Sequence, residues 1–419
     1  MMNEPSLKAR QLVEETISEI SPGFKEIENI RQYNMEKILR AFHDVRLGAT
    51  DFHSATGYGY GDIGREKLER VFAHIFKAED ALVRPAIASG THALALTMRA
   101  LLRAGDELVY LNGSPYDTMQ TVIGISGNAP GNYKEMGIHY RQIEMQDGHP
   151  DLEAIASELG YPRLAVIQRS SGYTNRPSVP IETIQKIATI VHEASPETIL
   201  MVDNCYGELT ETREPIEVGA DIVAGSLIKN LGGGVAPGGG YVAGSQELIN
   251  RVANFLTAPG LGKECGLMYD STRLYFQGLY FAPHITVEAM KNARLMAKLF
   301  EKMGYQILAE VFHKQSDIVA VITLGDPDKI ITFCKTVQAC GALDAHVTPE
   351  PWDMPGYDNK IIMAAGGLIE GSSIELSADG PIRPPYSVYY QGGLTFEQGI
   401  LTAQSLVDAF IQNGWQKCK

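Results

Sequence analysis

The fold is decided by residues 199–234, ILMVDNCYGELTETREPIEVGADIVAGSLIKNLGGG. Two apolar runs in this stretch, 199–203 and 221–227, each have the length of one buried strand and are separated by polar and turn-forming residues. The first run ends in Asp203, and the second is followed by Lys229 and a glycine cluster. We therefore expect two strands of an α/β sheet, each with a charged residue at its end.

Strand and helix patterns alternate on both sides of this stretch. Further strands are expected at 81–83, 107–111, 164–168 and 240–243, with helices starting at Thr91 and spanning 181–194. Strands that alternate with helices predict an α/β fold with a mostly parallel sheet. After a loop-like stretch at 258–278, a smaller α+β part is expected, with a helix at 283–302, strands at 318–323 and 361–364, and a last helix at 395–412.

The start of the chain has apolar residues at helical spacing. Residues 6–47 predict a helical arm with a break at Pro22 and Gly23. Residues 65–77 predict a helix with one buried stripe, formed by Leu68, Val71, Phe72, Ile75 and Phe76. We therefore expect three parts: an N-terminal helical arm (1–60), a large α/β domain (61–270) and a smaller C-terminal α+β domain (271–419).

Composition excludes several classes of protein. The 419 residues are 44% hydrophobic and 21% charged, which suits a globular chain with a large core, and the net charge of -14 gives no reason to bind nucleic acid or an anionic membrane. The five cysteines are odd in number and never spaced C-x-x-C, so neither a disulfide framework nor a metal site is expected. Without a signal-peptide pattern or an apolar run of about 20 residues, the expected location is cytoplasmic.

Two charged residues stand where a scaffold does not require them. Burial of an unpaired carboxylate is costly, so Asp203 is expected to have a partner, although an Asx turn or a helix cap would also explain it. Lys229 at the end of a buried strand can be desolvated, which lowers its pKa and makes the amine available for a Schiff base. The alternative is an exposed lysine in a flexible turn.

A third segment, Ser89-Gly90-Thr91, opens a predicted helix. Free N–H groups of a helix start, two hydroxyls and a glycine that permits close approach make an anion site, although an ordinary Ser/Thr cap has the same residues. A helix start suited to phosphate, a strand-end carboxylate and a strand-end lysine are together the parts of a pyridoxal phosphate site.

With these residues in view, the sequence resembles the fold-type I pyridoxal-phosphate enzymes with their PLP-dependent transferase fold. It is more closely similar to the Cys/Met-metabolism group of cystathionine and methionine lyases, and within it to the bacterial family related to methionine γ-lyase and often labelled aluminium-resistance protein. Five blocks in sequence order carry the resemblance over nearly the whole chain: GYGYGDIGREKLE (57–69), RPAIASGTHA (84–93), VDNCYGE (202–208), SLIKNLGGG (226–234) and DGPIRPPY (379–386).

The resemblance implies roles for single residues. Lys229 would hold pyridoxal 5'-phosphate covalently, and Asp203 would pair with the pyridinium nitrogen and keep the ring protonated. Tyr116 would stack on the ring, where the alternative is a half-buried loop tyrosine. The phosphate would be held by Ser89, Gly90, Thr91 and Ser226.

Other roles concern the substrate and a second subunit. Arg383, in a loop that prolines stiffen, would hold the α-carboxylate of an amino-acid substrate as a bidentate pair, unless it is only a rim arginine in a surface turn. Tyr58 and Tyr60 lie where the family has a Tyr-x-Arg that reaches the cofactor phosphate of a neighbouring subunit. No arginine lies two residues after either tyrosine here, so both stay candidates. The resemblance thus implies a homodimer or homotetramer with shared active sites.

The expected activity is that of a pyridoxal-phosphate carbon–sulfur lyase, which eliminates a thiol from the β or γ carbon of a sulfur amino acid such as methionine or cystathionine. Lys229 or a ring-side tyrosine would move the α-proton. Two alternatives remain: an aldolase or aminotransferase on the same fold, and a non-catalytic protein of metal stress, which would not need Lys229.

Overall fold

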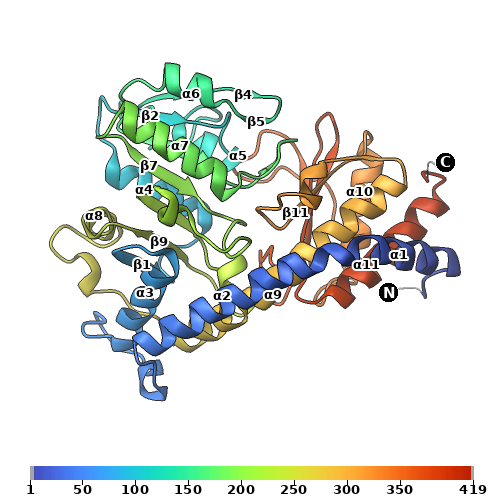
Figure 1. Ribbon diagram of the computed structural model, residues 1–419, viewed down its shortest axis with the longest axis horizontal. Helices are drawn as coiled ribbons and strands as arrows, with labels where there is room; N and C mark the ends of the chain where they lie inside the picture. The colour runs from blue at the N-terminus through green and yellow to red at the C-terminus, as the bar shows by residue number, and fades with distance from the viewer. Residues whose placement is uncertain (1–3, 417–419) are drawn as a thin grey trace.

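The computed structural model describes residues 4–416, and its larger part is built on a seven-stranded sheet (Figure 1). The strand order is β1-β9-β8-β7-β6-β2-β3, and β9 alone runs antiparallel to its neighbours. The strands are β1 (Asp80–Arg84), β2 (Glu107–Tyr110), β3 (His139–Gln142), β6 (Leu164–Gln168), β7 (Ile199–Asp203), β8 (Ile222–Ser226) and β9 (Gly240–Gly244). The predicted mostly parallel α/β sheet is confirmed.

Helices cover both faces of this sheet. In β7, Leu200 and Met201 face opposite sides and belong to different cores. The first core includes residues of α3 (Ile63–Phe76) and α7 (Ile181–Ala194), and the second includes residues of α4 (Gly90–Leu101) and α8 (Gln246–Leu256). Because both faces are covered, β6, β7 and β8 are buried along their whole length, which explains their continuous apolar sequences.

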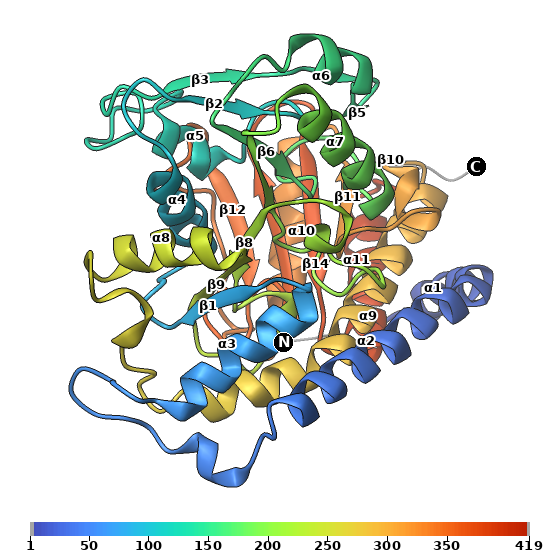
Figure 2. The ribbon, with the colours of Figure 1, turned by 60° about the vertical axis from the view of Figure 1, so that its left-hand side comes forward.

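The smaller part is a five-stranded antiparallel sheet with the order β10-β11-β14-β13-β12. Its strands are β10 (Gln306–Ile307), β11 (Val319–Thr323), β12 (Ile361–Ala365), β13 (Leu376–Pro381) and β14 (Ser387–Gly392). One face packs in a core with α9 (Thr272–Lys302), α10 (Pro327–Ala339) and α11 (Phe396–Gln412). The other face is turned toward the large sheet, as Figure 2 shows.

The N-terminal helices α1 (Leu7–Ile20) and α2 (Phe24–Asp44) are separated by a 3-10 turn, Ser21–Gly23. The predicted break at Pro22 and Gly23 is confirmed. Helix α2 lies along α9, where Ile27 packs with Ile285 and Ala289, so these two long helices run beside each other across the molecule (Figure 1). Shorter elements are α5 (Asp117–Ile123), α6 (Leu152–Glu158) and the hairpin of β4 (Met145–Gln146) and β5 (His149–Pro150).

The predicted start of the long helix at Pro283 is wrong, because α9 begins at Thr272 and contains Pro283 in its interior. A proline removes one hydrogen bond of a helix, so the sequence pattern suggests a boundary there. Here the turns before it are held by tertiary packing, since Tyr275, Phe276 and Leu279 are buried in the core of the large sheet. Their burial outweighs the lost hydrogen bond.

Two further features concern membrane spans and cysteines. Within residues 4–416, no helix is both long and apolar enough to cross a membrane. Four cysteines carry free thiols, namely Cys205, Cys265, Cys334 and Cys340, and Cys418 lies outside the described residues.

Candidate active site

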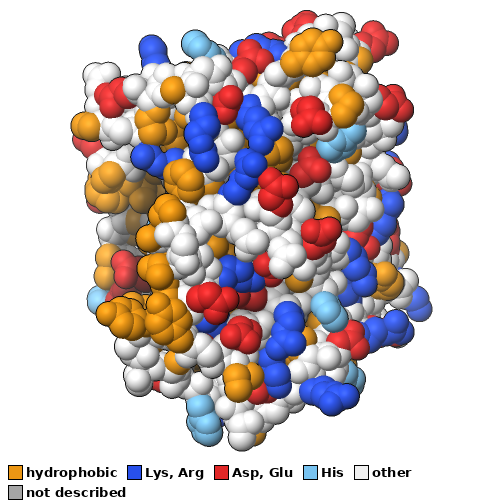
Figure 3. Space-filling view, turned by 90° about the vertical axis from the view of Figure 1, so that its left-hand side faces the viewer, with side chains coloured by type: hydrophobic (Ala, Val, Ile, Leu, Met, Phe, Trp, Pro, Cys, Tyr) orange, Lys and Arg blue, Asp and Glu red, His pale blue; other side chains and the backbone are white. Residues whose placement is uncertain are grey.

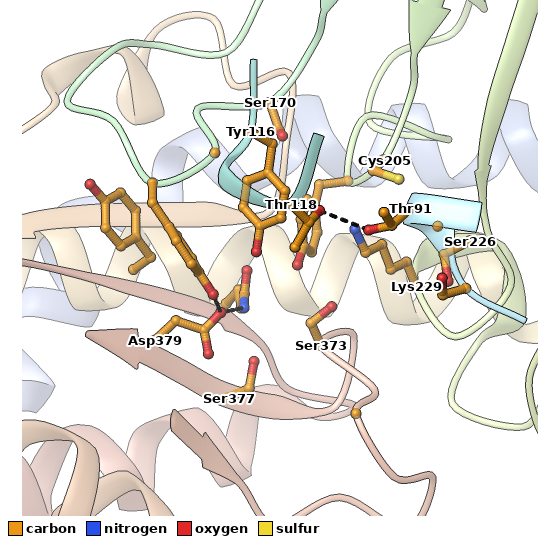
Figure 4. Close-up of a pocket in the computed structure, with 18 of the residues that line it drawn as sticks. Thr91, Tyr116, Thr118, Ser170, Cys205, Ser226, Lys229, Ser373, Ser377 and Asp379 are labelled. Atoms are coloured by element: carbon orange, nitrogen blue, oxygen red, sulfur yellow. Dashed lines mark hydrogen bonds between the residues drawn. The ribbon is translucent and has the colours of Figure 1, made fainter. Parts of the chain in front are cut away.

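A cavity of about 380 Å³ lies between the large sheet and the open face of the small sheet (Figure 4). Its large-sheet side is formed at the C-terminal ends of parallel strands and at the start of α4, by Ser89, Gly90, Thr91, Gln168, Asp203, Cys205, Ser226 and Lys229. Its small-sheet side includes Val319, Met363, Ala365, Ser377, Asp379, Tyr389 and Gln391. Ligands of open α/β sheets bind outside the carboxyl ends of the strands, so this cavity is the candidate active site.

Asp203 stands at the end of β7 with its carboxylate in this cavity. Its Oδ1 accepts a hydrogen bond from the Cys205 N–H at 3.2 Å, which is the Asx-turn geometry considered as an alternative. Burial raises the pKa of Asp203, while the charges of Lys229 and Arg176 and the Cys205 N–H oppose the rise. The residue therefore has both features: a local turn and a buried cationic partner across the cavity.

Lys229 follows β8 and opens the 3-10 turn Asn230–Gly232. Its Nζ lies 3.9 Å from the centroid of the Tyr206 ring, a cation–π distance. Burial by itself lowers the pKa of Lys229, but the acidic groups of Cys205, Tyr206, Asp203 and Glu208 raise it above its ordinary value. Desolvation lowers this pKa as expected, but the expected net decrease does not occur, because neighbouring acidic groups outweigh burial.

The groups around Lys229 differ in charge at neutral pH. Burial raises the pKa of the Cys205 thiol and of the Tyr206 hydroxyl, so both are uncharged. Burial also raises the pKa of Glu208 to about 8, so this carboxyl is mostly protonated at pH 7. Asp203 has the lowest ordinary pKa of these four groups, and its carboxyl and that of Asp379 both interact favourably with the ammonium of Lys229.

Tyr206 is held in an uncommon conformation beside Lys229. Its φ of 71° is in the left-handed region, which a bulky residue rarely adopts. The Asn230 side chain donates hydrogen bonds to the Tyr206 carbonyl at 3.0 Å and to the Glu208 carbonyl at 2.8 Å. The residue after Lys229 thus fixes the segment that carries the ring against the lysine, and such strain is often found at functional sites.

The start of α4 opens toward Ser226 and Cys205. Ser89 caps the helix, and its hydroxyl accepts a hydrogen bond from the His92 N–H at 3.0 Å. A Cβ on Gly90 would meet the Ser226 Cβ at 3.3 Å and the Cys205 sulfur at 3.4 Å, so a side chain here would crowd the cavity wall. The N–H groups of Gly90 and Thr91 lie in the first turn and have no carbonyl of their own helix to bond.

Tyr116 lies just before α5 and lines the cavity half-buried. Its N–H donates to the Gln168 side chain at 2.8 Å, and its hydroxyl shares a hydrogen bond with the Tyr357 hydroxyl at 2.6 Å. Its ring also meets the Tyr173 ring edge-on, with centroids 5.1 Å apart. Two parts of the fold therefore fix this ring at the cavity.

The small-sheet side of the cavity follows from strand register. Ser377 and Asp379 are two residues apart on β13, and they pair with Gln391 and Tyr389 of β14, so all four side chains share one face. The Asp379 Oδ2 accepts hydrogen bonds from the Tyr173 hydroxyl and from the Gln391 side chain, both at 2.8 Å. Burial raises the pKa of Asp379 to about 6.

Arg383 does not line the cavity. It follows β13 and pairs with Asp117, with Nη1 3.3 Å from the Asp117 Oδ2, while its Nη2 donates to the Tyr173 carbonyl at 3.1 Å. Its side chain is 31% exposed. Arg383 therefore lies outside the cavity wall. It contacts one lining tyrosine, Tyr173, directly, and it is connected to a second one, Tyr116, through the adjacent residue Asp117.

Tyr58 and Tyr60 are also away from the cavity, in the loop before α3. Their side chains are 77% and 56% exposed, and their ring centroids are 5.7 Å apart. Gly59 between them has a φ of 71°, and a Cβ there would meet the Gly266 carbonyl oxygen at 2.7 Å, so this turn requires glycine. The buried Arg65 donates to the carbonyls of Gly59 and Gly266, so it holds the loop rather than accompanying a tyrosine.

Several lining residues were not expected from the sequence, among them Gln168, Cys205, Tyr206, Tyr173, Tyr357 and Asp379. Gln168 ends the predicted strand 164–168 in the same way as Asp203 ends the next one, so its position carried a signal. Polar Ser377 and Asp379 alternate with apolar Leu376 and Ala378, which is the pattern of a strand with one polar face. Tyr173 and Tyr357 lie in loops, and only packing brings them together.

These residues fit pyridoxal 5'-phosphate. The space above Gly90, the free N–H groups of the first turn of α4 and the Ser226 hydroxyl suit a phosphate, while Asp203 suits a pyridinium nitrogen and Lys229 a covalent link. The pyridoxal-5'-phosphate dependent protein YhfS of Escherichia coli has the same fold, with a TM-score of 0.61 at 18% identity over 92% of this chain and 97% of that one. The fold is that of the fold-type I pyridoxal-phosphate proteins.

Within that class, the family model described as methionine gamma-lyase matches residues 9–411, and the chain belongs to this family. An uncharacterized Bacillus subtilis protein, YnbB, is 42% identical over 95% of both chains. The solved structure of a carbon-sulfur lyase involved in aluminum resistance from Clostridium novyi is 44% identical, with a TM-score of 0.91 over 96% of both chains. The resemblance seen in the sequence is thereby confirmed.

Proposed function

We propose that this protein is a pyridoxal-phosphate carbon–sulfur lyase that eliminates a thiol from the β or γ carbon of a sulfur amino acid. The observation that carries the proposal is one cavity lined by a half-buried lysine, a buried aspartate and an open helix start. Family membership and the similarity to a carbon-sulfur lyase support the same reaction.

Each of these groups has a task in that reaction. When bound, pyridoxal phosphate supplies an electron sink for the carbanion formed at the substrate's α carbon. Asp203 would pair with the ring nitrogen and favour its positive charge, and the start of α4 with Ser226 would hold the phosphate. The Tyr116 ring, fixed by Gln168 and Tyr357, orients the bound group.

Two side chains can hold the protons that the elimination moves. The Lys229 Nζ takes the α-proton once it is an unlinked amine, and as an ammonium it can return a proton. Burial raises the pKa of the Tyr116 hydroxyl well above its ordinary value, so Tyr116 stays protonated and can donate a hydrogen bond to the leaving sulfur. The C–S bond breaks with its electron pair on sulfur, the sulfur takes the proton held by the Lys229 ammonium, and a thiol leaves.

The test of this function is a coupled measurement of both products. Purified holoenzyme is incubated without oxygen with a panel of sulfur amino acids, and thiol and keto acid are assayed together. A lyase forms the two in equal amounts. An aminotransferase forms a keto acid without thiol and needs an acceptor, and an aldolase forms neither product, so either result would contradict the proposal.

Arg383 is proposed to take the α-carboxylate of the substrate. It already holds a carboxylate, that of Asp117, next to two lining tyrosines, and an exchange of Asp117 for substrate would keep its charge paired. Arg169 is not suited to this role, because it is buried in ion pairs with Glu211 at 2.9 Å and Glu214 at 3.7 Å.

Replacement of Arg383 by alanine is expected to raise KM for amino-acid substrates roughly 10-fold or more, because a charge-assisted hydrogen bond to the carboxylate is lost. Cofactor content should stay unchanged. Asp117→Asn is the matched variant for steady-state kinetics. It removes the carboxylate that pairs with Arg383, so KM should fall or stay the same if Arg383 binds substrate. Equal KM values for Arg383→Ala and the unaltered enzyme would mean that Arg383 has only a structural role beside the cavity.

We also propose that the active unit is at least a dimer, in which Tyr58 or Tyr60 of one chain completes the phosphate site of the other. Both tyrosines are exposed. Their loop contacts a second loop through the Gly266 N–H, which donates to the Tyr58 carbonyl, and one further apolar residue near each loop, Ile63 and Tyr269, is exposed as well. Hydrophobic side chains gather beside a hollow along one edge of the face in Figure 3. A rigid loop that presents two aromatic rings to solvent suits an interface with a second copy.

Mixing two inactive variants is expected to restore activity if the site is shared. One variant is Lys229→Ala and the other carries Tyr58→Phe and Tyr60→Phe; a hybrid dimer then contains one site with neither defect. Activity after subunit exchange, measured with the lyase assay, should rise toward half of the normal value per hybrid. The matched control mixes Lys229→Ala with Asp203→Asn, two defects of one cavity, and should stay inactive. No recovery in the first mixture would show that each chain builds its own site.

A further inference from the structure

The cavity carries an acidic side chain that the proposed reaction does not use. Among the described residues that line it, Lys229 is the cationic side chain, and Asp203 and Asp379 are the carboxylates. Asp203 interacts with Lys229 and has a role in the proposed cofactor site. Asp379 makes no ion pair with a described residue of the wall, although the charge of Lys229 acts on it.

The hydrogen bonds of Asp379 leave half of its carboxylate available. Both donors, the Tyr173 hydroxyl and the Gln391 amide, reach Oδ2, and within residues 4–416 no donor is bound to Oδ1. Both donors are also uncharged. With a pKa of about 6, the group is mostly ionised at neutral pH, and the charge of Lys229 adds to its two neutral hydrogen-bond donors in stabilising the buried carboxylate.

A second polar group near Asp379 is unpartnered. The Ser377 hydroxyl is buried, with 3% of the residue exposed, and has no hydrogen-bond partner among the described residues. It lies on the same face of β13, and Figure 4 shows it directed toward the Asp379 side of the cavity. Its oxygen can accept a hydrogen bond from a donor that enters the cavity.

Aromatic rings surround the same place. The Tyr173 ring lies 5.1 Å from the Tyr389 ring and 5.9 Å from the Tyr357 ring, centroid to centroid, and all three line the cavity. Ring faces attract cations, most strongly where water is excluded. A carboxylate oxygen, an unpartnered hydroxyl that can accept a hydrogen bond and ring faces together form a surface that suits a positively charged group.

We propose that this wall, formed by Ser377, Asp379, Tyr389 and Gln391 with the Tyr173 ring, binds a positive charge on the side chain of the substrate. The inference rests on the proposed function and specifies its substrate class: a sulfur amino acid that carries a second cationic centre. That centre is an ammonium on the leaving thiol, or a sulfonium, from which a neutral thioether leaves without taking a proton. Asp379 is then a specificity-determining residue, and neutral thioethers such as methionine are poor substrates.

Two substrates of equal size test the proposal on the unaltered holoenzyme. S-(2-aminoethyl)-L-cysteine and S-propyl-L-cysteine differ by an ammonium in place of a methyl. Elimination of the first adds one water and gives cysteamine, pyruvate and ammonia. The expected preference in kcat/KM for the ammonium compound is roughly 10- to 100-fold, the effect of one hydrogen bond to a charged group. Equal values for the two compounds, together with no preference for the sulfonium substrate described next, would overturn the proposal while leaving the lyase function intact.

S-methyl-L-methionine, a sulfonium, tells the two sources of charge apart. If it is preferred over methionine while the two cysteine derivatives react equally, the wall binds a positive charge located at sulfur. If the ammonium compound alone is preferred, the wall binds a positive charge on the part of the side chain that lies beyond sulfur. Either result supports a cationic substrate.

Asp379→Asn should abolish the preference, measured as the ratio of the two kcat/KM values, because the amide keeps the shape of the carboxylate and loses its charge. The matched control is Asp317→Asn, which changes another buried carboxyl with a pKa of about 6 that lies outside the cavity wall. It should keep the preference. A preference that survives Asp379→Asn would overturn the assignment to this residue.

A binding measurement separates this inference from the lyase function. Calorimetric titration of the holoenzyme with L-lysine and with L-norleucine involves no C–S bond. Tighter binding of L-lysine, lost in Asp379→Asn, supports the cationic wall even if no thiol is formed from any substrate, a case in which the proposed function alone would fail. Equal binding of the two amino acids, together with equal turnover of the matched cysteine derivatives, would reject the wall.

Discussion

Replacement of Lys229 by alanine is expected to lower kcat by about 10³-fold or more, because the side chain both links the cofactor and moves the α-proton. Unaltered protein should be yellow after purification. Borohydride reduction should fix the chromophore to the peptide that contains Lys229, as peptide mass analysis can show. In Lys229→Ala, covalent attachment is lost, and pyridoxal phosphate binds more weakly through the start of α4 and Asp203.

The control for this experiment is Lys186→Ala, a change on the helix α7 away from the cavity wall. It should keep both colour and activity. An unaltered protein that stays colourless after incubation with excess pyridoxal phosphate would contradict the cofactor assignment itself. Label on a different lysine would contradict only the role of Lys229.

The positions of Asp203 and Lys229 could be predicted because local signals define them. Each residue ends a run of apolar residues that can only be a buried strand, and neighbouring parallel strands bring their carboxyl ends to one edge of the sheet. Ser89 and Gly90 were predictable for a similar reason, since a helix start is a local feature. Positions that depend on a few consecutive residues could be found without a structure.

The small-sheet side of the cavity could not be predicted in the same way. Asp379 enters the cavity because β13 pairs with β14 in a register that turns one face toward the large sheet, and the sequence does not fix that orientation. The motif 379–386 led to the prediction of Arg383 as a site residue. In the structure, strand β13 places Asp379 in the cavity wall and ends before Arg383. Contacts between segments far apart in sequence decide such positions.

The pKa of Lys229 shows the same limit on a chemical property. Burial was foreseeable from the apolar strand, and burial alone lowers the pKa of an amine. The sign of the shift depends on which acidic groups surround Nζ, and those come from the segment after β7, folded back against the segment after β8. The local sequence indicates the cost of burial but not the neighbours that offset it.

Replacement of Asp203 by asparagine is expected to lower kcat roughly 10³-fold. The carboxylate keeps a positive charge on the ring nitrogen, and at about 4 Å with an effective dielectric of about 20 that interaction is worth roughly 4 kcal/mol, which corresponds to about 10³ in rate. Asparagine keeps an oxygen for the Cys205 N–H, so the turn after β7 should persist. Steady-state kinetics and the absorption spectrum of the bound cofactor measure the effect.

Glu208→Gln is the matched comparison for this change. Glu208 is as deeply buried and also faces Lys229, but its pKa of about 8 keeps it mostly protonated at pH 7, so the amide replaces an uncharged group. Glutamine can still accept the hydrogen bond from the Tyr241 hydroxyl, which is 2.8 Å from the Glu208 Oε1. Activity should therefore change only a few-fold. If both variants lose activity equally, with unchanged thermal unfolding, the negative charge of Asp203 is not what the reaction requires.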